Sequence, residues 1–244
     1  MPHLPESVRE AHRTVTDCGL GAAVSSTALA WDREKFPATP TWADFWDVAK
    51  IPGKRGLTKN VRGALEFALF ADGVAATDIY KTLATSEGAN RAFRKLDQLK
   101  PYIVWWQTPA EAAKILASGD VLMSAAPSGV VAMANRADKR NFGVQFAGGL
   151  LEPRYWAVVK GSPNLREAQQ FLYWTGAPSV QARLFRISGD VGMAKGVNDW
   201  LTHDLQALSP TFPANVSGAV RIDNAFWHDN LAKLRARFEA WLAQ

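Results

Sequence analysis

The apolar positions of the chain alternate between two spacings that belong to different secondary structures. Runs of apolar or small residues predict strands at 19–31, between Lys54 and Asn60, and at 102–106, 121–126, 142–146 and 155–159. Apolar residues three and four apart predict helices at 42–48, 60–71, 77–83, 86–99, 108–118, 128–137, 162–174, 179–185 and 223–243. Because strands and helices follow one another in turn, we expect an α/β fold with a mainly parallel sheet and helices on both faces.

Local signals predict where two of these helices begin. Thr41 is a good N-cap residue, and Asp44 lies where a carboxylate suits the positive end of a helix. Thr108, Pro109 and Glu111 supply an N-cap, a proline at the first helical position and a capping-box acid. Both first turns are therefore encoded by neighbouring residues.

The last predicted helix carries a long apolar stripe. Its members recur at helical spacing and are Phe226, Trp227, Leu231, Leu234, Phe238, Trp241 and Leu242. A stripe of this width has to be buried against another part of the fold. We expect this helix to pack onto the preceding residues through Trp227, Leu231, Leu234 and Phe238.

Composition and charge limit the classes of protein that fit. The 244 residues are 48% apolar and 21% charged, which is typical of a globular chain with a sizeable core. The net charge of +5 comes from scattered lysines and arginines, and the densest cluster, 136–140, is interrupted by Asp138. We therefore expect no nucleic-acid partner. Cys18 is the only cysteine and says nothing about the compartment.

The N-terminal residues lack the pattern of a targeting segment. Residues 1–17 are polar and broken by Pro2 and Pro5, which predicts an arm. They contain neither a basic start followed by an apolar stretch nor a small-residue cleavage site, so we expect no signal peptide. The chain also has no apolar run of about 18 residues, the minimum for a membrane-spanning helix.

Motifs for catalysis, metal binding and cofactor binding are missing from the sequence. The four histidines are far apart, and none has a second histidine with an acid or cysteine at metal-binding spacing. Ser128 lies in Ala-Pro-Ser-Gly, which lacks the first glycine of a nucleophile elbow, and capping a helix is a sufficient role for it. No glycine-rich phosphate loop occurs. We expect no enzyme, no metal and no cofactor.

Several motifs in order resemble a family of solute receptors. They are Trp42-x-Asp44-Phe45-Trp46 with Pro52-Gly-Lys-Arg-Gly-Leu57, Gly119-Asp-Val-Leu-Met123, Trp156-Ala-Val-Val-Lys-Gly-Ser-Pro-Asn164 and Ala168-Gln-Gln-Phe-Leu-Tyr-Trp174. From about Cys18 to Gln244 the chain resembles the periplasmic spermidine/putrescine-binding proteins of polyamine ABC importers. The resemblance implies a type II periplasmic-binding fold that lacks most of its first lobe. It also implies a periplasmic location, a small solute held between two lobes and a membrane permease as partner.

The same resemblance predicts a division of the chain. Residues 18–150 and 195–244 would form the second lobe, residues 151–194 would be a returning segment of the first lobe, and residues 1–17 would be the arm. Segment 154–190 would then lack its usual cover at Tyr155, Trp156, Val158, Phe171, Leu172 and Trp174. We expect either a homodimer that pairs these segments or a sticky, partly disordered region.

The positions that match the family's ligand contacts predict an altered site. A polyamine needs carboxylates for its ammonium groups and aromatic faces for its methylenes. Where the family tends to place these, this chain has Asn60 and Gly63, Ala125, Glu152 to Arg154, and Asp190. Arg154 would repel a cation, so we expect weak or absent spermidine binding.

The candidate ligand-binding residues are Asn60, Ser128, Glu152, Arg154 and Asp190. Their ligand is a small solute, polyamine-like or related. A second hypothesis remains open, that this shortened copy binds no solute and acts only through interaction with another molecule.

Overall fold

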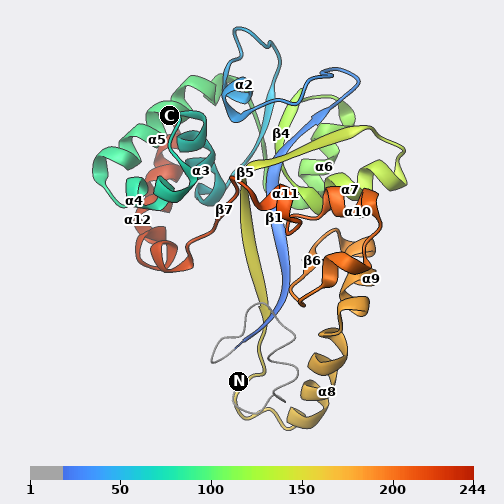
Figure 1. Cartoon of the computed structure of the whole chain (residues 1–244). Helices are drawn as coiled ribbons and strands as arrows, with labels where there is room; N and C mark the ends of the chain where they lie inside the picture. Colours follow the sequence, from blue (N-terminus) through green and yellow to red (C-terminus); the bar gives the residue numbers. More distant parts are fainter. Residues whose placement is uncertain (1–18) are drawn as a thin grey trace.

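The computed structural model describes residues 19–244, so the predicted arm at 1–17 lies outside the described residues. The sheet has seven strands in the order β3-β2-β4-β1-β5-β7, with β6 paired to β1 (Figure 1). The strands are β1 (Leu20–Asp32), β2 (Arg55–Thr58), β3 (Ile103–Trp106), β4 (Met123–Pro127), β5 (Phe142–Trp156), β6 (Val191–Gly192) and β7 (Val220–Arg221).

Helices connect these strands and cover the sheet. The α-helices are α2 (Trp42–Trp46), α3 (Val61–Ala71), α4 (Ile79–Leu83), α5 (Ser86–Leu99), α6 (Pro109–Ser118), α7 (Ser128–Ala137), α8 (Leu165–Thr175), α9 (Pro178–Ser188), α10 (His203–Leu208), α11 (Pro213–Val216) and α12 (Asn224–Leu242). Short 3-10 turns lie at Ala76–Asp78, Lys100–Tyr102 and Val197–Trp200. Thr41 and Thr108 are both N-caps, as predicted, and each forms a capping box, which was predicted only for Thr108.

The sheet is mixed, where the sequence predicts a mainly parallel one. Strand β2 is parallel to β3 and to β4, and β5 is parallel to β7, but β1 is antiparallel to β4, β5 and β6. Side chains of β1 alternate between two apolar clusters: Leu29 and Trp31 face helices α2, α3, α5 and α12, whereas Ala30 faces α6 and α7. Both faces of the sheet are therefore covered, as predicted.

One long strand replaces two predicted ones. Strand β5 runs without a break through 142–156, and residues 157–159 of the second predicted strand lie outside it. The register against β1 shifts between Gln145, opposite Leu29, and Leu150, opposite Thr27. The four residues between them bulge around Gly148, which has φ +74°. A Cβ there would lie 2.4 Å from the ring of Trp42. The bulge, with a glycine at its centre, lets β5 continue past the point where its backbone approaches the Trp42 ring.

Helix α12 packs onto the larger core as predicted. Trp227, Leu234 and Phe238 are buried in the cluster that includes α3 and α5, and Leu231 is partly buried against it. Figure 1 shows α12 beside α3 and α4, on the side of the sheet opposite α6 and α7. The packing of the C-terminal helix is confirmed.

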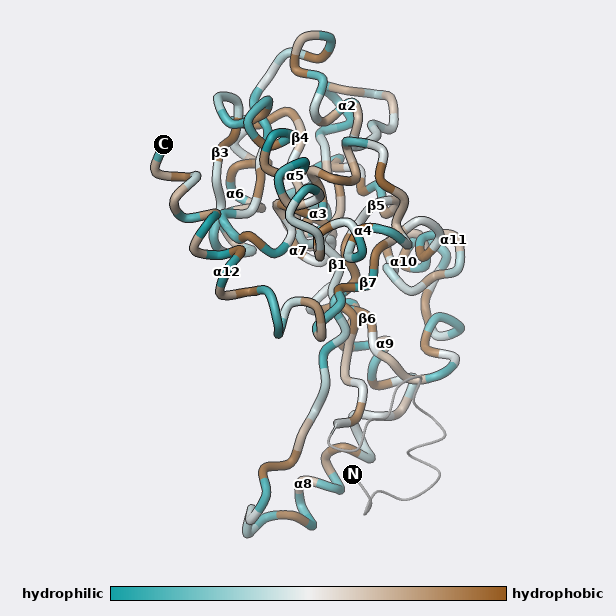
Figure 2. The backbone as a smooth tube through the Cα atoms, turned by 90° about the vertical axis from the view of Figure 1, so that its left-hand side faces the viewer, coloured by the Kyte–Doolittle hydropathy of each residue, from teal (hydrophilic) through white to brown (hydrophobic). Residues whose placement is uncertain are grey.

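The lower part of the molecule has a smaller core of its own. The far ends of β1 and β5 extend away from the main body, with α8 and α9 alongside (Figures 1 and 2). Phe185, Val191, Val197 and Leu201 pack there with Val24 of β1. The division of the chain into lobes stays a prediction.

Helix α8 presents large apolar side chains at the surface. Phe171 is 47% exposed and Trp174 is 60% exposed, and Trp156, 44% exposed, meets Phe171 edge to face. Leu172 was expected to lack cover, but it is buried, so the prediction was wrong at that position. A homodimer through this segment stays a prediction.

Candidate functional site

A cavity of about 340 Å³ opens where β2 passes into α3 and β4 passes into α7. Because these two strands are parallel, their carboxyl ends meet at one edge of the sheet, a common location for ligands in α/β proteins. Residues of β5 and the residues just after α9 complete the wall. Elements far apart in the sequence thus meet around one hollow.

The cavity brings together four of the five predicted site residues. Asn60, Glu152, Arg154 and Asp190 line it. Ser128 does not, although Pro127 and Gly129 on either side of it do. The Ser128 hydroxyl is buried without a hydrogen-bond partner among residues 19–244. It is also not the N-cap, because α7 begins at Ser128 itself and Pro127 precedes it as the cap. The predicted capping role was therefore wrong.

Two ion pairs form part of the cavity wall. The Arg62 guanidinium lies 3.2 Å from a Glu152 carboxylate oxygen, and that of Arg154 lies 3.3 Å from Asp190. Burial raises the pKa of Asp190, and the Arg154 guanidinium opposes that rise. The site therefore offers positive and negative charge side by side, with the Arg62 and Asp190 side chains the better shielded from water, at 28% and 24% exposed, and Arg154 the least, at 58%.

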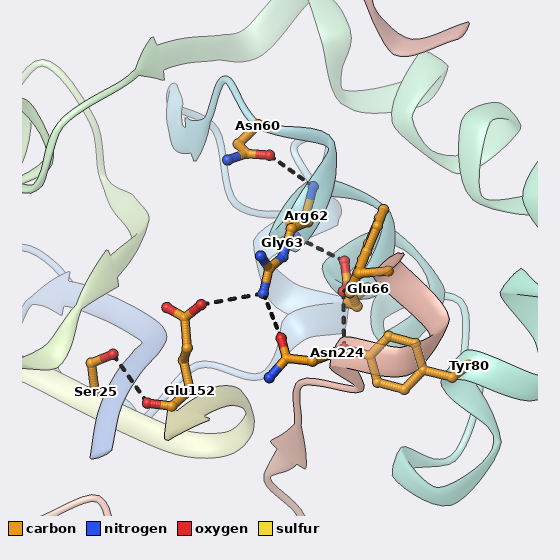
Figure 3. Close-up of polar contacts among 9 residues, drawn as sticks. Ser25, Asn60, Arg62, Gly63, Glu66, Tyr80, Glu152 and Asn224 are labelled. Atoms are coloured by element: carbon orange, nitrogen blue, oxygen red, sulfur yellow. Dashed lines mark hydrogen bonds and ion pairs between the residues drawn. The ribbon is translucent and has the colours of Figure 1, made fainter. Parts of the chain in front are cut away.

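Arg62 is the cation that sequence reasoning missed. It comes two residues after Asn60, whose side-chain oxygen accepts a hydrogen bond from the Arg62 backbone N–H at 3.0 Å. Asn60 thus caps the short turn that precedes the regular part of α3 and fixes the backbone just before the arginine. The Arg62 guanidinium also donates to the side chain of Asn224 at 3.2 Å. Figure 3 shows it between Glu152 and Asn224.

A buried carboxyl lies directly behind Arg62. Glu66 is fully buried, and it accepts hydrogen bonds from the Gly63 backbone N–H at 2.8 Å, the Tyr80 hydroxyl at 3.0 Å and the Trp227 indole at 2.8 Å. Burial raises the pKa of Glu66, and these hydrogen bonds oppose the rise. Burial and the neighbouring Glu66 also raise the pKa of Tyr80. The sequence signal was a single acid inside the apolar run of a helix.

The remaining walls are apolar or weakly polar. Phe67, Trp106 and Leu150 supply apolar surface, and Thr27 and Thr58 supply hydroxyl groups. Phe67 is held by stacking on Trp42 at a centroid distance of 4.3 Å. An apolar lining with a few placed charges suits a small molecule that has charged ends and an aliphatic middle.

Metal binding and membrane insertion find no support between residues 19 and 244. In that range no three histidine, cysteine or acidic side chains gather closely enough to hold a metal ion. None of the helices described there has the length and apolar character needed to cross a membrane.

The fold and the cavity define a solute-binding protein, and comparison with known families agrees. Residues 4–214 match the bacterial extracellular solute-binding protein family, and the chain belongs to that family. It is a family of binding proteins, which confirms the prediction that the chain is not an enzyme.

Among curated proteins, a gamma-aminobutyric acid-binding protein of Pseudomonas aeruginosa PAO1 is 45% identical over 233 residues. The match covers 95% of this chain but 66% of that relative, so the chain spans slightly less than two thirds of its length.

Solved structures confirm the α/β, periplasmic-binding-protein fold class. One is the binding protein MotA of A. tumefaciens B6 in complex with glucopine, with a TM-score of 0.84 and 27% sequence identity. The alignment covers 98% of this chain and 76% of the MotA chain. Another is the structure described as the Atu4243-GABA receptor, with a TM-score of 0.83 and 26% sequence identity. The alignment covers 99% of this chain and 75% of the receptor chain. The ligands named for these proteins are not polyamines, so the predicted spermidine/putrescine type is not supported.

Proposed function

We propose that this chain carries the ligand site of a solute-binding protein that captures a small zwitterionic amino acid of the γ-aminobutyrate type for an ABC importer. The observation that carries the proposal is the presence of two ion pairs in the lining of one cavity: Arg62 with Glu152, and Arg154 with Asp190. A ligand with a carboxylate and an ammonium group can give its carboxylate to one of the arginines and its ammonium group to one of the carboxylates, so each charge of the ligand meets a partner of opposite sign.

The shape of the ligand follows from the same residues. Its carboxylate would be bound by Arg62 or Arg154, and its ammonium group by Asp190 or Glu152. The methylenes between them would lie on Phe67 and Leu150. A polyamine carries only positive charge, so both arginines oppose it. The names of two similar proteins, which bind or receive γ-aminobutyrate, support this class of ligand.

Delivery to a membrane permease completes the proposed function. In the family the solute is captured outside the inner membrane and handed to the importer. Closure of a binding protein around its solute commonly provides the signal for such a partner.

Calorimetry with four ligands tests this proposal. We expect γ-aminobutyrate to bind, and butyrate, butylamine and spermidine to bind at least about tenfold more weakly, because each lacks one of the two charges. We expect Arg154→Ala to weaken γ-aminobutyrate binding by about tenfold or more. Arg235→Ala, which removes an exposed arginine from α12, is the matched control and should bind like the parent. Tighter binding of spermidine than of γ-aminobutyrate would contradict the proposal.

A further inference from the structure

The turn that carries Arg62 has an unusual backbone. Arg62 has φ −70° and ψ 124°, and Gly63 has φ +98° and ψ −53°, so neither residue is helical although both lie within the bounds of α3. A positive φ of this size is easily adopted only by glycine. The regular helix therefore begins after Gly63. The preceding turn points the Arg62 side chain toward Glu152 and Asn224 (Figure 3), and Arg62 lines the cavity.

Glu66 holds this turn from inside the protein. One of its carboxyl oxygens accepts the hydrogen bond of the Gly63 N–H at 2.8 Å, as the acid of a capping box does. An oxygen of a carboxyl can accept this bond whether or not the group is protonated. The contact fixes the peptide that joins Arg62 to Gly63.

The other oxygen of Glu66 ties the same turn to two more helices. It accepts from Tyr80 of α4 at 3.0 Å and from Trp227 of α12 at 2.8 Å. Asn224, the second partner of the Arg62 guanidinium, lies three residues before Trp227 at the start of α12. Glu66 therefore sets the position of Arg62 and also that of the helix end that Arg62 contacts.

The burial of Glu66 is difficult to explain by stability alone. No ion pair found among residues 19–244 includes it, and an apolar side chain at this place would avoid the cost of desolvating a carboxyl group. Two of its three bonds lead to the turn that carries Arg62 and to α12, which carries Asn224, a partner of the Arg62 guanidinium. A buried polar network of this kind can define one arrangement of a site.

We propose that Glu66 is a positioning residue for ligand recognition, which holds the Arg62 guanidinium in the cavity through the Gly63 turn and the first turn of α12. For the identity of the ligand this inference rests on the proposed function. Glu66 does not touch the ligand, because it is fully buried and does not line the cavity.

A double-mutant cycle separates positioning from general stability. We expect Glu66→Gln to weaken γ-aminobutyrate binding about tenfold, since a glutamine amide cannot accept from Gly63 and from Trp227 together. In an Arg62→Ala background the same change should alter the Kd less than twofold, because the group that it positions is gone. Leu99→Ala, a core change on α5, should lower the Tm and leave the Kd unchanged.

Equal effects of Glu66→Gln in both backgrounds, or no effect on the Kd, would overturn the inference. If Glu66→Gln does not fold, Glu66→Asp takes its place, because the shorter side chain cannot reach both donors. If the parent binds no γ-aminobutyrate, the proposed function fails, and a crystal structure of the unliganded Glu66→Gln protein decides the inference separately. Loss of the Arg62 contacts to Glu152 and Asn224 would support it, and their retention would overturn it.

Discussion

Leu234→Asp is expected to destabilise the protein by at least about 4 kcal/mol, which is a large part of the stability of a typical domain. Leu234 is 4% exposed and lies in the core cluster between α12 and the sheet. The change removes a buried apolar side chain and places an unpaired carboxyl group among apolar neighbours. Urea unfolding followed by circular dichroism measures the loss.

Ala236→Asp is the matched control for this change. It adds the same carboxyl group to an exposed position of the same helix, so its effect should stay within about 1 kcal/mol. If the two variants unfold at the same urea concentration, the placement of α12 on the core is wrong.

Arg55→Met is expected to cost at least about 3 kcal/mol, because it removes the donor from a buried hydrogen bond to Phe45 and from two partly buried ones to Gly53 and Ile51. The Arg55 side chain donates to the carbonyl oxygens of Phe45 at 2.8 Å, Gly53 at 2.7 Å and Ile51 at 2.6 Å. Arg55 is fully buried, and burial lowers its pKa to about 10. It thereby holds the segment between α2 and β2 in place.

Lys54→Met removes the same charge from the exposed neighbouring residue and should change the unfolding midpoint little. Thermal unfolding of the two variants makes the comparison. A melting temperature of Arg55→Met equal to that of Lys54→Met would show that the carbonyl groups find other donors and that Arg55 is dispensable.

Elements encoded by neighbouring residues were predictable from the sequence, and those that depend on distant pairing were not. The first turns at Thr41 and Thr108 follow from residues within three positions of each cap. Strand β5 contains Gly148 and Pro153, which locally favour a break. The strand continues because β1 pairs with it on both sides of the bulge, and because Pro153 lies beyond the short pairing with β7.

The candidate site divides in the same way. Glu152, Arg154 and Asp190 were predicted because they lie at positions that match the ligand contacts of the resembled family. The pairing of Arg154 with Asp190 was not predictable, because it depends on how the chain after α9 returns to β1 and β5. Arg62 and Glu66 were missed because helical spacing assigns polar residues to the solvent side. Glu66 breaks that rule inside a run of buried residues from Gly63 to Leu69.

A crystal structure of the protein with γ-aminobutyrate tests the central claim most directly. We expect the ligand in the cavity between β2, β4 and β5, with its carboxylate within about 3 Å of the Arg62 or Arg154 guanidinium and its ammonium group at Asp190 or Glu152. Density elsewhere on the molecule, or a ligand in the cavity that contacts none of these four side chains, would contradict the account.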